Sequence, residues 1–156
     1  MASREPSPEG LLIAHYERYD EARRLEGDIG PLEAARTREL IQRFLPSAPA
    51  TVLDDGGAAG AYSFWLASLG YHVHLLDIVP RHIAQALEAS RRASTPALAS
   101  ILVGDARQLP FETGKMDAVV LAGPLYHLAE RGERLQALAE AQRVLRSGGV
   151  LLAFGI

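Results

Sequence analysis

Acidic residues follow three separate apolar runs of this 156-residue chain, and they are its first candidates for chemistry. Asp54 and Asp55 open a glycine-rich loop, Asp77 ends "HVHLLD", and Asp105 follows "ILVG". A carboxylate that follows a strand, behind a glycine-rich first loop, accepts hydrogen bonds from ribose hydroxyls. We therefore expect Asp77 to bind a ribose. Capping the next helix and shaping a loop are the alternative roles of Asp77 and Asp105.

The loop "DDGGAAG" at residues 54–60 combines two acids with almost no side-chain bulk. Such loops commonly hold a pyrophosphate against the N-terminus of a helix. A carboxylate at the start of the loop would repel a pyrophosphate but would attract an ammonium or sulfonium group. Asp54 therefore favours a nucleoside with a cationic amino-acid tail over a dinucleotide.

Tyr126 and His127 follow a fourth apolar run, "MDAVVLAGP", and are candidate catalytic residues. A histidine can take a proton from an oxygen or nitrogen nucleophile, and a tyrosine ring can stack on a cation. The alternative is that both only form the wall of a site. His72 and His74 have metal-ligand spacing on one strand face, but no third ligand is evident, so we interpret them as ordinary strand residues.

Strand and helix patterns alternate five times after residue 50. Expected strands cover 51–55, 72–77, 98–105, 116–124 and 150–156, and expected helices cover 60–70, 80–94 and 129–149. Because the strands are apolar on both faces, they suit a parallel sheet covered by helices. We predict an α/β fold: a doubly wound, mainly parallel, Rossmann-like sheet of about five strands with flanking helices. Its ligands would bind at the carboxyl ends of the strands, where the acids stand.

Five segments carry a resemblance to a known family. They are "VLDDGGAAG", "LASLGYHVHLLDIVP", "VGDARQLPF", "MDAVVLAGPLYHL" and "RVLRSGGVLLAF", in this order within residues 51–156. Together they closely resemble the class I S-adenosylmethionine-dependent methyltransferases. The resemblance implies that S-adenosylmethionine is the cofactor, that S-adenosylhomocysteine is its product, and that methyl transfer is the activity.

The resemblance also implies roles for the residues behind each strand. Asp54 and the loop would line the methionine moiety; the loop residues are Gly56, Gly57, Ala58 and Gly60. Asp77 would bind the ribose hydroxyls, and Gly123 would lie beneath the sulfonium. On the adenine, Ile78 would pack, Asp105 would accept from the amino group, and the Ala106 amide would donate to a ring nitrogen.

The N-terminal segment has its own pattern. Residues 1–10 are rich in Pro, Ser and Glu, and we expect them to be flexible. Helices expected within 11–46 resemble those that many members fold over the cofactor, and residues 47–156 would form the Rossmann-like domain. Tyr16 and Tyr19 could close over the cofactor or pack on the core. Arg36 and Arg38 could meet the cofactor carboxylate, although an exposed helix face is the better interpretation.

Two residues depart from the family loop, acid-x-Gly-x-Gly-x-Gly. Ala58 replaces the middle glycine, which would cost about 1 kcal/mol if the position needs a positive φ. Asp55 stands where the family usually has a small apolar residue, and it points to the opposite strand face from Asp54. A buried carboxyl needs a partner or a raised pKa. We expect Asp55 to hydrogen-bond a backbone amide, a hydroxyl or an arginine.

Family members usually continue beyond "LLAFGI" with a helix and two more strands, one of them antiparallel. Without these strands, 150–156 would lie near a sheet edge, and an apolar edge strand invites pairing with another chain. We therefore expect a homodimer through this edge. The alternatives are a fragment of a longer protein and an edge covered by the N-terminal helices.

Composition narrows the remaining choices. The net charge is −3 and no basic stripe is evident, which argues against a nucleic-acid substrate. There is no cysteine, which fits the cytoplasm, and no apolar run approaches the ~20 residues of a membrane span. We predict a methyltransferase with a small-molecule acceptor and no metal. The alternatives are a cofactor-binding or regulatory module without turnover, and an NAD-dependent oxidoreductase, which Asp54 disfavours.

Overall fold

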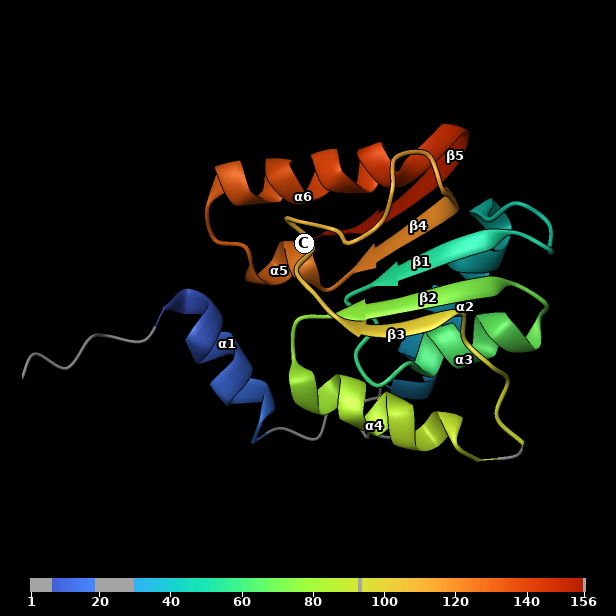
Figure 1. The fold of residues 1–156 in the computed structure, drawn as a ribbon, viewed down its shortest axis with the longest axis horizontal. Coiled ribbons are helices and arrows are strands. Elements are labelled where there is room, and N and C mark those ends of the chain that lie inside the picture. The colour runs from blue at the N-terminus through green and yellow to red at the C-terminus, as the bar shows by residue number, and fades with distance from the viewer. Residues whose placement is uncertain (1–6, 19–29, 93, 156) are drawn as a thin grey trace, which may run out of the picture.

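The computed structural model describes residues 7–18, 30–92 and 94–155, and a five-stranded sheet forms its centre (Figure 1). The strands are β1 (Thr51–Asp55), β2 (His72–Asp77), β3 (Ser100–Val103), β4 (Met116–Ala122) and β5 (Leu145–Phe154). Their spatial order is β3-β2-β1-β4-β5, and every pair is parallel. The predicted doubly wound, parallel α/β fold is confirmed.

Helices cover both faces of this sheet (Figure 1). The helices on one side are α2 (Gly30–Phe44), α3 (Ala61–Ser68) and α4 (Pro80–Ser90), and those on the other are α5 (Pro124–His127) and α6 (Arg131–Val144). Adjacent residues of β1 pack against opposite helical layers. Val52 packs on the side of α2 and α3, and Leu53 packs on the side of α6. Both are fully buried, as expected of a parallel strand between two helical layers.

The topology brings the strand ends together. The chain passes from β1 to β2 and β3 on one side, and then returns to pair β4 with the other edge of β1. In Figure 1 the arrowheads of β1 to β4 point to the same end of the sheet, where α5 and α1 (Pro8–Tyr16) lie. The reversal of strand order beside β1 opens a crevice there, which is where such sheets bind ligands.

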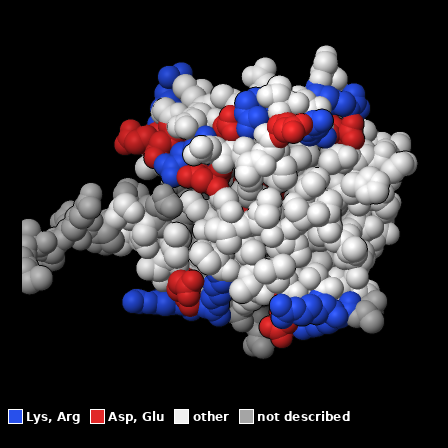
Figure 2. All heavy atoms as spheres, viewed as in Figure 1, with Lys and Arg blue, Asp and Glu red and all other residues white. Residues whose placement is uncertain are grey.

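Charged side chains gather in two bands on the face seen in Figure 2, one over α6 and one over α4. Both signs occur in each band, and the broad zone between them is uncharged. Among the described residues, no helix is long and apolar enough to span a bilayer.

The ends of several elements differ from the sequence prediction, those of α1 and β5 most clearly. Helix α1 begins at Pro8 because the Ser7 hydroxyl caps it, accepting the Gly10 N–H at 3.1 Å, so residues 8–10 are helical instead of flexible. Strand β5 begins at Leu145, and the "RSGG" segment expected to end α6 is extended and pairs irregularly with β4. The short helix α5 was not predicted. Tyr19 lies outside the described residues.

Candidate functional site

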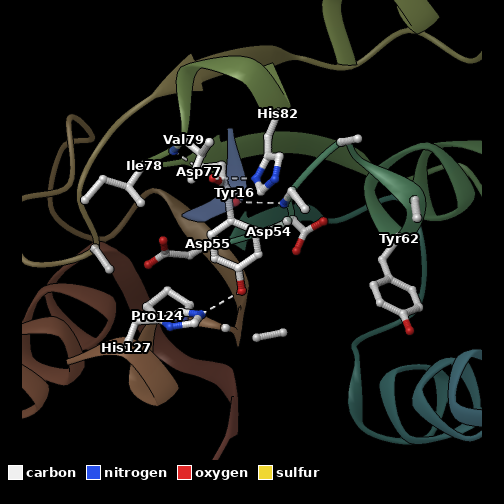
Figure 3. A pocket seen from close by; sticks show the side chains of 18 of the residues that line it. Tyr16, Asp54, Asp55, Tyr62, Asp77, Ile78, Val79, His82, Pro124 and His127 are labelled. Atoms are coloured by element: carbon white, nitrogen blue, oxygen red, sulfur yellow. Dashed lines mark hydrogen bonds and ion pairs between the residues drawn. The ribbon is translucent and has the colours of Figure 1, made fainter. Parts of the chain in front are cut away.

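A cavity of about 880 Å³ opens at the carboxyl ends of the strands (Figure 3). Its walls come from the loop after β1, the ends of β2, β3 and β4, and helices α1, α2 and α4. The predicted site residues that line it are Asp54, Gly56, Gly57, Ala58, Asp77, Ile78, Asp105, Ala106, Gly123, Tyr126 and His127. The fold therefore brings together residues from four separate strand ends.

Gly60 is the one predicted cofactor residue outside the cavity lining. It precedes α3 with φ +88°, and a Cβ there would come within 2.9 Å of the Phe64 ring. Gly60 therefore permits the turn into α3 and the packing of Phe64, which is a structural role.

Asp77 is buried in the wall of the cavity, with 6% of its surface exposed. Its Oδ1 accepts the Val79 N–H at 2.9 Å and lies 3.1 Å from His82 Nδ1, while its Oδ2 accepts the Ala58 N–H at 2.9 Å. The Val79 bond shapes the turn before α4, but α4 has no side-chain cap, so Asp77 holds the turn instead of capping the helix as the alternative had it. The Ala58 bond ties Asp77 to the loop after β1, and Oδ2 keeps a lone pair for a ligand.

Asp54 is fully buried on the face of β1 that looks toward α3. Its Oδ2 accepts the Ser63 hydroxyl at 2.6 Å, and its Oδ1 has no hydrogen-bond partner among the described residues. Burial, helped by the Asp77 charge and opposed by the Ser63 bond, raises the pKa of Asp54 to about 6. An unpartnered carboxyl oxygen in a cavity wall is suited to receive a cationic or N–H group.

The partner expected for Asp55 is absent from the described residues. Both of its oxygens are buried without a hydrogen bond, so that prediction was wrong. The raised pKa takes its place: burial, followed by the charges of Asp54, Asp77 and Asp105, raises the pKa of Asp55 well above its ordinary value. Of these acids the sequence shows only Asp54 as a neighbour of Asp55, because Asp77 and Asp105 come from distant positions in the chain.

Replacing Asp55 with valine is expected to raise the free energy of unfolding by about 2 kcal/mol at pH 7, because a buried, unpartnered polar group is removed. The folded protein holds protons on Asp54 and Asp55 above pH 4, where the unfolded chain has lost them. Wild-type stability should therefore fall as pH rises from about 4 through 6 and beyond. Urea denaturation at several pH values should show a shallower fall in Asp55→Val. A destabilised variant would indicate a partner for Asp55.

Asp105 holds the loop after β3 through Arg107. Its Oδ1 accepts from the Arg107 amide at 2.8 Å and from Nε at 3.0 Å, and its Oδ2 accepts from Nη2 at 2.6 Å. Burial acts to raise the pKa of Asp105, but the side-chain and backbone hydrogen bonds from Arg107 outweigh it and lower the pKa. The loop-shaping alternative thus applies, and the carboxylate still lines the cavity.

The loop after β1 approaches its neighbours too closely for most side chains. A Cβ on Gly56 would lie 2.4 Å from Pro124 Cδ, and one on Gly57 would lie 2.5 Å from Asp54 Oδ2. Gly56 also has φ +80°. Ala58 has φ +49°, the left-handed conformation that disfavours a side chain.

Ala58→Gly is expected to stabilise the protein by about 0.5–1 kcal/mol, because relief of the left-handed strain exceeds the added flexibility of the unfolded chain. The Ala58 N–H that binds Asp77 is retained in this variant. Urea denaturation measures the difference, and Ala59→Gly, which changes a residue without a positive φ, is the control. Equal changes in the free energy of unfolding in the two variants would contradict backbone strain at Ala58.

Tyr16 of α1 reaches across the mouth of the cavity (Figure 3). Its hydroxyl lies 3.0 Å from His127 Nε2, and its ring packs edge-on against His127 and His82, with centroids 5.5 Å and 5.2 Å apart. Arg81 of α4 donates to the Glu17 carbonyl and so fastens the end of α1. The sequence left two roles open for Tyr16, at the cofactor site or in the core, and in the structure Tyr16 lies at the cavity.

Sequence reasoning missed two residues that orient the acids. Ser63 holds Asp54, and buried His82 holds Asp77. The available signals were weak: a serine in the first turn after the loop, and a histidine five residues beyond Asp77.

Three other sequence candidates lie elsewhere. Arg36 pairs with Glu39 on an exposed face, and Arg38 lies over the Trp65 ring. His74 bonds Ser100, and among the described residues no cluster of three or more His, Asp or Glu could hold a metal ion.

Comparison with known proteins places this cavity in context. Residues 53–153 match the family model described as "Methyltransferase domain". The chain is 33% identical over 134 residues to nodulation protein S of Rhizobium tropici, covering 85% of this chain and 54% of that protein. It spans about half the length of the curated relatives it matches.

Solved structures share the fold of this chain. The PH0226 protein of Pyrococcus horikoshii has a TM-score of 0.75 and 26% identity, over 87% of this chain and 62% of that one. A TehB-like SAM-dependent methyltransferase of Corynebacterium glutamicum has a TM-score of 0.66 and 27% identity, over 88% of this chain and 72% of that one. The family match and the structural similarity therefore both indicate a methyltransferase fold.

Proposed function

Because this chain belongs to the class I S-adenosylmethionine-dependent methyltransferases, we propose that it transfers a methyl group from S-adenosylmethionine to a small-molecule acceptor. The observation that carries the proposal is the pair of buried carboxylates, Asp54 and Asp77, beside a narrow loop in one cavity. When bound, the cofactor supplies an electrophilic methyl group on a sulfonium.

The residues present fit this cofactor. The unpartnered Oδ1 of Asp54 suits the cationic amino-acid tail, whereas a pyrophosphate would be repelled. Asp77, preset by two backbone amides, would accept from the ribose hydroxyls. On the adenine, Ile78 would pack against the ring, Asp105 would accept from the amino group, and the Ala106 amide would donate to a ring nitrogen.

The methionine half would lie against the close-packed loop of Gly56, Gly57 and Ala58. Gly123, which follows β4 and faces the Gly56 carbonyl, would lie beneath the sulfonium. Methyl transfer is an in-line displacement, so the protein's main task is to align the acceptor with the methyl group.

The acceptor would enter beside α5. Tyr126 and His127 line the cavity there, together with Tyr16 from α1. His127 would take a proton from an oxygen or nitrogen acceptor, and Tyr126 would stack on the sulfonium. The mixed charge bands and uncharged middle of the face in Figure 2 give a polyanion no basic track, which favours a small molecule over a nucleic acid.

Isothermal titration calorimetry tests the cofactor directly. S-adenosylmethionine and S-adenosylhomocysteine should bind, and NAD should not, because Asp54 opposes its pyrophosphate. Failure of both adenosyl ligands to bind would contradict the proposal. Binding without methyl transfer to any acceptor would favour a binding module.

The proposal extends to assembly and location. Strand β5 is an edge of the described sheet, and we propose that it pairs with the same strand of a second copy in a homodimer of the cytoplasm. Light scattering should give twice the monomer mass. A monomer at high concentration would contradict the dimer.

A further inference from the structure

Asp55 is the one carboxyl, among the described residues, whose two oxygens are both buried without a hydrogen bond. Only 1% of its surface is exposed, yet it is one of the residues that line the cavity. An unpartnered buried carboxyl destabilises the free protein. A buried polar group without a hydrogen bond in the wall of a cavity is commonly one whose hydrogen-bond partner is the ligand.

The position of Asp55 shows which half of the cavity it serves. It ends β1, in register with both Leu76 of β2 and Leu121 of β4, so the register alone does not place it. Asp77, which ends β2, and Asp105, which follows β3, are both near enough for their charges to act on Asp55. Figure 3 shows the Asp55 carboxylate directed away from Asp54 and Tyr62. Asp55 therefore lies on the side of the cavity formed by the ends of β2 and β3.

The surroundings of Asp55 favour one chemical form. Asp54, Asp77 and Asp105 are near enough for their charges to act on it, and burial acts in the same direction, so its proton is retained. A protonated carboxyl offers an O–H donor beside a carbonyl acceptor. The amino group of adenine has two hydrogens and stands between two ring nitrogens, so adenine presents the complementary pair twice. The edge that Asp105 and the Ala106 amide do not use can pair with Asp55, and the ribose hydroxyls can pair with either oxygen.

We propose that Asp55 is an additional cofactor-binding residue that hydrogen-bonds the adenosine moiety of S-adenosylmethionine. The inference rests on the proposed function, and it adds a polar contact at a position where the family pattern has a small apolar residue. Asp55 would then be unsatisfied in the free protein and satisfied in the complex.

Calorimetry with three probes tests the contact: S-adenosylhomocysteine, adenosine and methionine. Asp55→Val should weaken S-adenosylhomocysteine and adenosine by the same factor, about tenfold, as expected for one net hydrogen bond. Methionine binding should not change. Asp55→Asn, which keeps a donor and an acceptor in the same shape, should restore most of the affinity. Leu53→Val, on the same strand face but outside the cavity lining, controls for a general disturbance of β1.

The outcomes separate the inference from the proposed function. If the wild-type protein binds neither S-adenosylhomocysteine nor adenosine, the proposed function fails. If the wild type binds S-adenosylhomocysteine and adenosine, and Asp55→Val binds these two ligands equally well, the cofactor assignment stands and the inference is overturned. A loss for S-adenosylhomocysteine but not for adenosine would also overturn it. Asp55→Ala provides a second truncation should the valine variant not fold.

Discussion

Asp77→Ala is expected to weaken S-adenosylhomocysteine binding at least a hundredfold and to lower the free energy of unfolding by about 3 kcal/mol. Three donors lose their acceptor in this variant: the Ala58 and Val79 amides and the His82 imidazole. Buried donors without partners are costly, and bonds to a charged group are the stronger kind. The affinity should fall further than loss of the proposed ribose contact alone would require, because Asp77 also fixes the loop that is proposed to hold the methionine moiety.

The control for this variant is Asp117→Ala. Asp117 also accepts a backbone amide, that of Thr51 at 2.7 Å, and pairs with Arg146, but it stands at the amino end of β4, away from the cavity. Asp117→Ala should lower stability while leaving S-adenosylhomocysteine affinity unchanged. Urea denaturation and calorimetry give the two quantities. If Asp77→Ala kept wild-type affinity, the carboxylate would serve only to hold the turn before α4 and the loop after β1.

The strand ends were predictable because each signal was local. Apolar runs fix the positions of β1, β2 and β4, and parallel pairing places their carboxyl ends at one edge. Asp54 and Asp77 could therefore be assigned to one site without knowledge of any contact between them. The sequence likewise pointed to the question of a positive φ at Ala58, because a glycine is usual at that position of the loop.

Features that depend on distant contacts were not predictable. Asp55 was expected to have a partner because most buried carboxyls do, but its neighbours are other acids: Asp54 beside it on β1, and two that the fold brings from the end of β2 and the loop after β3. The contacts of His82 depend on the packing of α4, which brings its ring beside Asp77 and Tyr16, and nothing local in the sequence indicates them. Tyr16 itself lies 111 positions from His127, and no periodicity could pair them.

His127→Asn is expected to lower the rate of methyl transfer about a hundredfold, the usual size of a general-base contribution, while the affinity for S-adenosylmethionine stays within twofold. His127 follows β4, where the acceptor would approach, and its Nε2 faces the Tyr16 hydroxyl at 3.0 Å. That contact orients the imidazole, so Tyr16→Phe should give a smaller loss in the same direction.

The measurement is S-adenosylhomocysteine formation with the acceptor found by screening small phenols, amines and thiols. His74→Asn is the matched control, because His74 bonds Ser100 and lies outside the cavity lining. A thiol acceptor, which ionises readily without help, should depend on His127 less than a phenol or an amine does. Unchanged turnover of every acceptor in His127→Asn would leave His127 as a wall residue, with alignment alone accounting for the rate.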